Sequence, residues 1–362
     1  MLFGPGGGAT HLLHVCRALV QRGAEITLVS RFSDKNTPLL HLHREIPIRF
    51  ISTPFARNRA LYRLSTAWAL SVWPFLLRTK YDVLYTWELS PFTKFLSRFV
   101  HRKGRVILQR IGEPLAENEC LDPFLEKLLD GLIVESPLQA EAARRVISRE
   151  ISILALPNLG HCASLPSPNG HRPNEVFQIT FLGRYDRGKG IYRLMEIWPQ
   201  LNIGEAELNF HGWGPEREQL QRLVSRQGFG AHIHLNGAYS TANELSAILA
   251  ATDLLVLPSE TEGLPVVLLE SMARGVPFVA ADVGAVSTLA ENNPNVKVVP
   301  LDNVSLKEAI QEMARAIRAG HIRSDRLQRY YQTRYGYEAL SRKWCDALLR
   351  PEQVWGQPEL SH

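Results

Sequence analysis

Short apolar runs alternate with amphipathic segments along most of the chain. The runs end at glycine, proline or polar residues, which is typical of strands buried in a parallel sheet. The segments between them place apolar residues at helical spacing, as Leu12, Val15 and Leu19 do in residues 9–22. This alternation predicts an α/β protein with doubly wound parallel sheets. The expected strands are residues 25–30, 46–52, 82–86, 105–109, 131–135, 151–155, 176–182, 207–210, 233–236, 253–257, 278–281 and 297–299.

The length and one proline-rich segment predict two domains. A chain of 362 residues is long enough to divide its hydrophobic core in two. Residues 157–173 are rich in proline, glycine and asparagine, which indicates a linker. We therefore expect one domain over residues 1–156 and a second over residues 174–334. A last helix is expected over residues 335–350.

The segment 258–275 combines a polar loop with a short helix directly after a buried apolar run. Pro265 suits the first turn of this helix, and Gly275 suits the position after its end. Ligands of open α/β sheets bind outside the carboxyl ends of the strands, where a helix start attracts phosphate. Glu262 in the loop and Glu270 on the helix could each accept hydrogen bonds from hydroxyl groups of a different ring. The pattern suits a sugar nucleotide, although two solvated glutamates would look the same.

Two further loops carry features that suit phosphate. Arg184 and Lys189 flank the loop after the first strand of the second domain, and an arginine fork with a lysine charge can neutralise a diphosphate. A glycine-rich loop that ends in Gly7 and Gly8 opens the first helix, where it lets backbone approach a phosphate closely. Solvated loop cations and an ordinary glycine turn are the alternatives.

The residues from Ser259 to Ala280 are similar to the signature of the retaining glycosyltransferases of family 4, and the loop from Gly183 to Gly190 resembles the phosphate loop of that family. The resemblance implies the GT-B fold, which is two Rossmann-like domains facing across a cleft. It also implies that the N-terminal domain meets the acceptor and the C-terminal domain binds the nucleotide sugar. The terminal helix would cross back to the N-terminal domain.

The implied reaction transfers a sugar from a nucleotide-diphosphate donor to a hydroxyl group with retention of configuration, and the leaving phosphate takes the acceptor's proton. Arg184, Lys189 and Glu262 would be the catalytic residues, because the cations stabilise the leaving diphosphate and Glu262 holds sugar hydroxyls. Glu270 would hold the ribose, and Tyr239 would either stack on the nucleobase or cover the core. The implied donor site comprises Gly7, Gly8, Arg184, Lys189, Tyr239, Glu262, Gly263, Leu264, Pro265, Val266, Val267 and Glu270.

The chain departs from the family pattern in two places. Only Leu2 and Phe3 stand before the glycine loop, where a full buried strand is expected. Either the start of the chain is misassigned, or the first sheet lacks a central strand and exposes the edges of its neighbours. Trp87, followed by Glu88, stands at a strand end where many family members have a histidine near the transferring sugar. His11, beside the glycine loop, is a further functional candidate.

Composition and charge narrow the class of protein to which the chain can belong. The chain is 45% hydrophobic and 21% charged, as soluble globular proteins are, and it shows neither a signal peptide nor an apolar run long enough for a membrane span. Four scattered cysteines favour reduced thiols in the cytoplasm. Residues 1–170 carry seven more basic than acidic side chains. This excess suits an anionic membrane or an acidic glycan, or is only a solvated surface, and no nucleic-acid motif accompanies it.

The expected helix over residues 57–78 is aromatic and basic, which suits a membrane surface or an acceptor site as well as a buried helix. No Asp-x-Asp pair occurs in the sequence, so we predict an enzyme that needs neither a metal nor a cofactor. The acceptor would be a glycan or a lipid-linked glycan. Alternatives are a sugar-nucleotide epimerase on the same fold and a non-catalytic nucleotide-sugar-binding protein. A dinucleotide dehydrogenase is poorly supported, because no GxGxxG follows a full strand.

Overall fold

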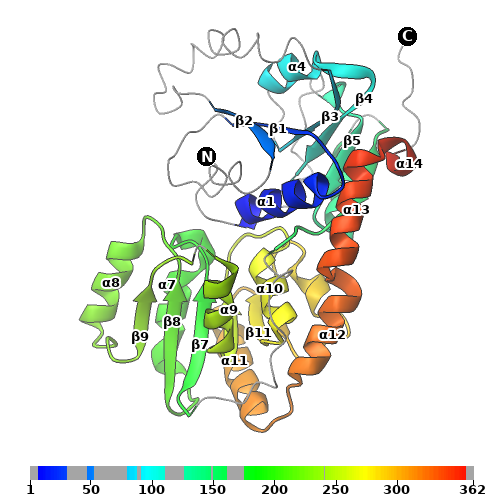
Figure 1. Ribbon diagram of the computed structural model, residues 1–362. Helices are drawn as coiled ribbons and strands as arrows, with labels where there is room; N and C mark the ends of the chain where they lie inside the picture. Colours follow the sequence, from blue (N-terminus) through cyan, green and yellow to red (C-terminus); the bar gives the residue numbers. More distant parts are fainter. Residues whose placement is uncertain are drawn as a thin grey trace. The chain divides into compact units, whose positions relative to one another are not determined.

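The computed structural model describes residues 7–30, 47–52, 80–87, 91–110, 126–147, 150–160, 175–239 and 241–355. The chain forms two compact units (Figure 1). Unit 1 comprises Met1–Leu159 together with Ala339–His362, and unit 2 comprises Gly160–Glu338. All the strand pairs among these residues are parallel, which confirms the predicted α/β class. The expected helix over 57–78, residues 161–173 of the expected linker, and Glu88 lie outside the described residues.

Unit 2 is built on a six-stranded sheet whose two central strands are almost completely buried. β7 and β10 pair side by side in its middle, and the chain then runs outward to β8 and β9 on one side and to β11 and β12 on the other. Such a reversal of direction is a topological switch point, where α/β sheets bind ligands. The strands are β7 (Phe177–Leu182), β8 (Ala206–His211), β9 (Ile233–Asn236), β10 (Leu254–Leu257), β11 (Phe278–Ala281) and β12 (Lys297–Val299), in the order β12-β11-β10-β7-β8-β9.

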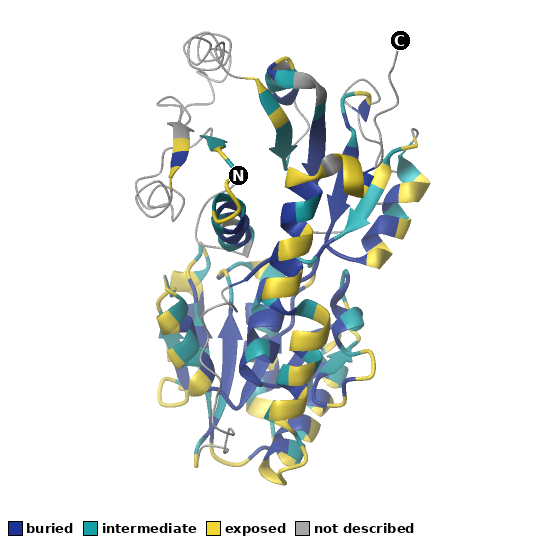
Figure 2. Ribbon diagram, turned by 45° about the vertical axis from the view of Figure 1, so that its right-hand side comes forward, coloured by how far each residue is buried: buried dark blue, intermediate teal, exposed yellow. Residues whose placement is uncertain are grey.

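Helices cover the sheet of unit 2, and their outer faces are exposed while the strands are buried (Figure 2). Local capping signals fix several helix ends. Thr241 and Glu244 form a capping box at the start of α9, and Gly275 ends α10 in the left-handed conformation, with φ of 73°. The helices are α7 (Ile191–Ile197), α8 (Arg217–Arg226), α9 (Ala242–Ala250), α10 (Val266–Arg274), α11 (Asn303–Arg318) and α12 (Ser324–Tyr335).

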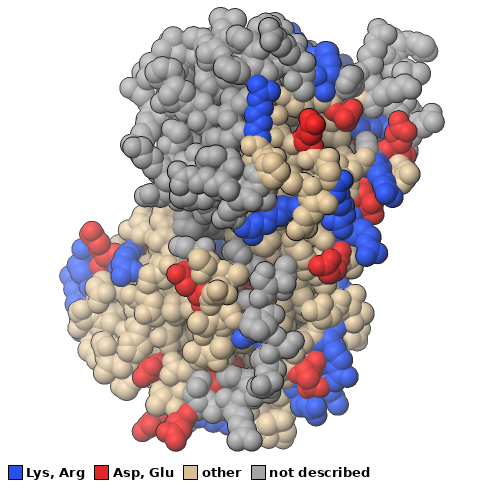
Figure 3. All heavy atoms as spheres, viewed as in Figure 1, with Lys and Arg blue, Asp and Glu red and all other residues tan. Residues whose placement is uncertain are grey.

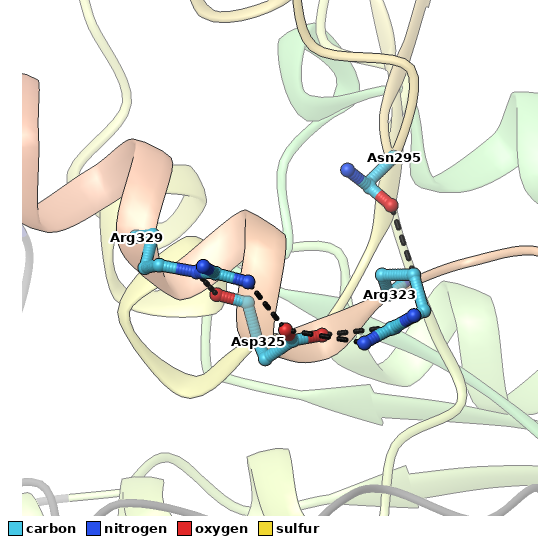
Figure 4. A network of polar contacts seen from close by, with 4 residues as sticks. All are labelled: Asn295, Arg323, Asp325 and Arg329. Atoms are coloured by element: carbon cyan, nitrogen blue, oxygen red, sulfur yellow. Dashed lines mark hydrogen bonds and ion pairs between the residues drawn. The ribbon is translucent and has the colours of Figure 1, made fainter.

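The start of α12 is held by a small polar network (Figure 4). The buried Asn295 accepts a hydrogen bond from the Arg323 backbone N–H at 2.9 Å. Asp325 in the first turn pairs with the guanidinium groups of both Arg323 and Arg329, at 3.0 and 2.6 Å. These hydrogen bonds, that of Arg323 above all, lower the pKa of Asp325. The network compensates for the missing side-chain cap at this helix start.

The described strands of unit 1 form two parallel sheets. β1 (Ile26–Ser30) pairs with β2 (Ile48–Ser52), and a second sheet has the order β3 (Tyr81–Thr86), β4 (Val100–Gln109), β5 (Gly131–Val134), β6 (Ser152–Ala155). Within the described ranges, no backbone ladder joins β1 to β3, although the Tyr81 hydroxyl donates to Thr27 Oγ1 at 3.4 Å. Residues of α1 (Gly7–Val20) pack against β1 and β2 and against Tyr85 of β3.

The C-terminal segment belongs to unit 1. α13 (Tyr337–Leu349) buries Trp344 completely, and the indole N–H of Trp344 donates to the Pro157 carbonyl at 2.9 Å. In α14 (Pro351–Trp355) the ring of Trp355 packs closely on Gly131 of β5. A Cβ on Gly131 would stand only 2.7 Å from this ring. The described residues of unit 1 also include the short helices α4 (Pro91–Ser97) and α6 (Pro137–Val146). Every helix among the described residues is too short or too polar to cross a membrane.

Candidate functional site

The candidate site lies at the carboxyl ends of β7 and β10, at the switch point of unit 2. The loop of residues 183–190 follows β7, and the loop of residues 258–265 follows β10. The Glu260 N–H donates to the Gly188 carbonyl at 2.8 Å, which ties the two loops together. Gly190 has φ of 71°, and a side chain there would overlap the Pro258 carbonyl. The two loops therefore lie directly against each other.

The structure brings together two of the three predicted catalytic residues. Lys189 Nζ lies 2.7 Å from Glu262 Oε1, although the residues are 73 positions apart in the sequence. Their side chains are 29% and 12% exposed, so the pair is sheltered but reachable from solvent. An ammonium that donates in three directions can keep this partner while it meets a second anion. The arrangement thus places a cation and a hydrogen-bond acceptor side by side at the sheet edge.

Arg184 is held by Asp186, a residue that the sequence analysis missed. Arg184 Nε lies 2.7 Å from Asp186 Oδ2, and half of the Arg184 side chain is exposed. The other Asp186 oxygen accepts the Lys189 backbone N–H at 3.2 Å and caps the short helix η3 (Arg187–Lys189). One carboxylate therefore holds the Arg184 side chain and the main chain of Lys189. Its position before a Gly-Lys-Gly turn is the sequence signal that could have revealed it.

Tyr185 fixes the same loop to the neighbouring strands. Its buried hydroxyl lies 2.7 Å from the Phe210 carbonyl and 2.8 Å from the Asn236 carbonyl, at the ends of β8 and β9. Its backbone N–H donates to the Trp213 carbonyl at 2.7 Å. Burial raises the pKa of the Tyr185 hydroxyl, so this group stays protonated at neutral pH. Sequence pattern alone gives no sign of this role, because the partners are backbone groups of distant strands.

The segment before α10 is held from the side of β11 as well. The Gly263 carbonyl accepts the Ala285 N–H at 2.9 Å, and a side chain on Gly284, where φ is 59°, would overlap the Glu262 carbonyl. Leu264 is buried and anchors the segment in the core. Pro265 precedes the helix as its cap, with φ of −63°, so α10 begins at Val266, one residue later than the sequence predicts. The Leu268 N–H donates to the Pro265 carbonyl at 3.1 Å, which closes the first turn.

The remaining predicted donor residues are distributed over both units. Glu270 is buried on α10, one turn beyond Val266, and Val267 between them is partly exposed. Tyr239 is partly buried and packs against the hydrophobic core of unit 2, so it covers the core, which is one of the two roles expected for it. Gly7 and Gly8 belong to unit 1, and the expectation of a loop there is wrong, because both residues form the first turn of α1. Glycine is tolerated at a helix start, where few intrahelical bonds depend on it.

Unit 1 contains a buried polar network around His11. His11 Nδ1 accepts the Leu159 N–H at 2.9 Å, so the ring proton sits on Nε2 and faces Gln109 Oε1 at 3.2 Å. Burial lowers the pKa of His11 to about 3, which keeps the ring neutral. The Gln109 amide donates to Asn158 Oδ1 at 2.8 Å, and Asn158 donates to the Glu135 carboxylate. The segment after β6 is therefore anchored within unit 1.

Trp87 belongs to the same network at the carboxyl end of β3. Its indole N–H donates to the Tyr85 hydroxyl at 2.8 Å, and that hydroxyl donates to Gln109. The Trp87 ring is nearly parallel to the His11 ring, at an angle of 20°. These polar side chains follow apolar strands, and that position is the signal by which the sequence could have revealed Gln109 and Glu135. No group of three or more metal-ligating side chains occurs among the residues that the structure describes.

Two family models match the chain. Glycosyl transferases group 1 matches residues 176–316, and glycosyltransferase family 4 matches residues 5–109. Together they cover more than half of the chain, most of unit 2 and much of unit 1. The protein therefore belongs to the family 4 glycosyltransferases of group 1, and its Rossmann-like units have the GT-B fold. Both conclusions confirm what the segment from Ser259 to Ala280 implies in the sequence.

Individual proteins show the same likeness. The phosphatidyl-myo-inositol mannosyltransferase of Mycobacterium leprae is 26% identical over 327 residues, which are 86% of this chain and 84% of that protein. The structure of sucrose-phosphate synthase from Thermosynechococcus elongatus superposes with a TM-score of 0.79 at 19% identity, over 96% of this chain and 94% of that one. Anabaena HepE in complex with UDP and glucose gives a TM-score of 0.72 at 16% identity, over 96% and 97%.

Proposed function

We propose that this glycosyltransferase moves a hexosyl group from a nucleotide-diphosphate sugar to a hydroxyl group, with retention of anomeric configuration. The observation that carries the proposal is the 2.7 Å pair of Lys189 and Glu262 beside the start of α10. A cation, a carboxylate and a helix start gathered at a switch point suit a ligand with a diphosphate between two hydroxyl-bearing rings. HepE, solved with UDP and glucose, has the same fold and supports this donor class.

Each side chain of the proposed site has a separate role. Arg184 and Lys189 stabilise the negative charge that develops on the departing diphosphate, and the N–H groups at Val266 and Val267 add to this effect. Glu262 accepts hydrogen bonds from the sugar, and Glu270 accepts them from the ribose. Asp186 holds the Arg184 side chain and the Lys189 main chain in place before the donor arrives. The site is thus prepared for charge on the leaving group.

Retention follows if bond breaking and bond making occur on one face of the sugar. The bond from the anomeric carbon to the diphosphate oxygen breaks, the bond to the acceptor oxygen forms, and the acceptor's proton passes to the departing phosphate. Arg184 and Lys189 supply the positive charge that this step needs, so we propose that it proceeds without a metal ion. No protein nucleophile is required by this scheme.

The acceptor that we propose is a glycan or a lipid-linked glycan, in polysaccharide or glycolipid synthesis. The relative from Mycobacterium leprae is named for transfer to phosphatidyl-myo-inositol, which supports a lipid-linked acceptor. Lys and Arg side chains are prominent on the described surface of unit 1 in Figure 3. They suit peripheral contact with an anionic membrane on its cytoplasmic face. The exposed ones are Arg22, Arg49, Lys80, Arg98, Lys127, Arg144, Arg145, Arg342, Lys343 and Arg350.

Thermal unfolding with UDP-, GDP- and ADP-sugars in the presence of EDTA tests the donor proposal. A donor that binds the folded protein raises the melting temperature by mass action. We expect a rise with one nucleotide class, which Arg184→Ala and Glu270→Ala abolish and Lys297→Ala preserves. Lys297 is a matched control, because it forms a 2.7 Å pair with Glu312 at another surface of unit 2. A rise that disappears with EDTA contradicts metal independence, and no rise with any donor contradicts the proposal.

A further inference from the structure

Gly160 lies so close to the start of α10 that a side chain there has no room. A Cβ on Gly160 would stand 2.6 Å from Val266 Cγ1 and 3.1 Å from both Cγ and Oε1 of Glu270. Real Cβ atoms essentially never approach other heavy atoms within 3.0 Å. Gly160 is not among the residues with positive φ, so its backbone conformation does not itself require glycine. The close approach of the main chain to α10 is the reason for glycine at this position.

The neighbours of Gly160 cannot readily move away. Val266 is 7% exposed, and a β-branched side chain at the first position of a helix has few alternative rotamers. Glu270 is 2% exposed on the same helix, so its carboxylate is confined by the surrounding core. An added methyl group at residue 160 would therefore displace the first turn of α10, the Glu270 side chain, or both.

We propose that Gly160 is a positioning residue of the donor site. Its main chain forms the wall against which Val266 and the Glu270 carboxylate are placed, and it thereby sets the helix start for the phosphates and the carboxylate for the ribose. This inference rests on the proposed binding of a nucleotide sugar at α10. Gly160 directly follows the anchored segment Leu156–Leu159 in the chain, and it is not part of the predicted donor site.

The test compares nucleotide binding by Gly160→Ala and by a matched glycine variant. Gly230→Ala is the control, because a Cβ there meets nothing within 4 Å and the residue has no positive φ. Calorimetry with UDP, GDP and ADP gives the dissociation constant for whichever nucleotide the wild-type protein binds. We expect Gly160→Ala to weaken that binding about tenfold and Gly230→Ala to leave it unchanged. In Gly160→Ala the KM for the donor sugar should rise together with this dissociation constant, while kcat should change less.

A second pair of variants separates a specific clash from general damage. Val266→Ala removes the Cγ1 atom that the new methyl group would meet, so Gly160→Ala/Val266→Ala should bind nucleotide about as well as Val266→Ala alone. Circular dichroism and melting temperature report whether each variant is folded. If Gly160→Ala does not fold, the double variant Gly160→Ala/Val266→Ala takes its place in the test. A double variant that folds and binds nucleotide supports the inference.

The outcomes distinguish this inference from the function on which it rests. If the wild-type protein binds none of the nucleotides, the proposed function is wrong and the role of Gly160 falls with it. If the wild type binds one of them and Gly160→Ala binds it equally well, only the role of Gly160 is wrong. A loss of binding that Val266→Ala does not restore also overturns it, because the damage then has another source.

Discussion

The pair of Lys189 and Glu262 joins one residue from each of the two central loops. Neither side chain is deeply buried, so their attraction adds little to folding, in the range of about 0–1 kcal/mol. The same charges count for more in a reaction, where they act on charge that develops only in the transition state. The pair should therefore matter for catalysis far more than for stability.

Removing the lysine tests this difference. We expect Lys189→Ala to lower kcat/KM on the order of 100-fold, because one preorganised donor to the leaving group is lost. The free energy of unfolding should change by less than about 1 kcal/mol, as in the matched variant Lys297→Ala, which breaks a pair of equal length. Steady-state kinetics and urea unfolding measure the two effects. Equal activity in both variants would show that Lys189 has no part in the reaction.

His11 makes the stability of unit 1 depend on pH. Its pKa is about 3 in the folded protein and about 6.5 in an unfolded chain, so the unfolded state binds more protons between these values. The free energy of unfolding therefore falls as the pH falls below about 6.5, by up to about 1.4 kcal/mol per pH unit. Urea unfolding at pH 7, 6 and 5 should show this loss, and His11→Gln should reduce the slope. The exposed His232 provides the control, and equal slopes in His11→Gln and His232→Gln would refute the role of His11.

Some site residues could be predicted from the sequence because their place in the chain reveals them. Lys189 and Glu262 stand in polar loops directly after apolar strands, and parallel strands end at one edge of a sheet. Asp186 caps a turn three residues further on, so its signal is local as well. Tyr185 could not be predicted in this way, because its partners are carbonyl groups of β8 and β9. Such contacts depend on the folded arrangement, and no local pattern encodes them.

At the level of elements, the glycines hold the two loops of the site in contact. Gly190 and Gly228 have nearly the same φ, 71° and 72°, but only Gly190 faces another chain segment, the Pro258 carbonyl. Alanine at either position must adopt the left-handed conformation, which costs roughly 1–2 kcal/mol. Alanine at 190 must in addition push the two loops apart. Comparing alanine variants of the two glycines therefore separates the cost of conformational strain from the cost of lost close packing.

We expect Gly190→Ala to lower the free energy of unfolding by roughly 3 kcal/mol or more, and Gly228→Ala by only about 1 kcal/mol. The larger loss reflects the overlap with Pro258, which also separates Lys189 from Glu262. Urea unfolding gives both values, and the melting-temperature rise with a donor sugar should disappear only in Gly190→Ala. Similar losses in the two variants would mean that the loops tolerate separation.

Most elements follow from the sequence, and the exceptions have physical reasons. The strands of unit 2 lie within a residue or two of their predicted positions, because buried parallel strands are continuous apolar runs. β4 is different, since it begins at Val100 rather than at residue 105. Its first residues, Val-His-Arg-Lys-Gly, are mostly polar, and the register with β3 shifts between Tyr81 and Val83. This part of β4 is a strand because it pairs with β3, and its hydrophobic pattern gives no sign of that pairing.

On the scale of the whole molecule, each unit has a core of its own. The C-terminal segment completes unit 1 through Trp344, which is fully buried, and through Trp355, which packs on Gly131. The sequence predicts a separate last helix, but the indole hydrogen bond to Pro157 joins residues 187 positions apart and has no local signature. Damage to this segment should therefore affect unit 1 first.

Trp344→Ala tests the independence of the two cores. We expect it to destabilise unit 1 by about 3–5 kcal/mol, because a large buried ring leaves a cavity and the Pro157 carbonyl loses its donor. The unfolding of unit 2 should stay at its original temperature in a calorimetric scan. Trp213→Ala is the control, since that indole is 39% exposed. A common shift of both transitions would show that the units unfold together.

The short ladders of unit 1 have a consequence for the exchange of backbone protons. Among the described residues, β1 and β3 each pair with a strand on one side, whereas β7 and β10 pair with strands on both sides. A strand held by ladder bonds on two sides opens less often than one held on a single side. In a hydrogen-exchange experiment, the N–H groups of β1 and β3 should therefore take up deuterium from solvent faster than those of β7 and β10.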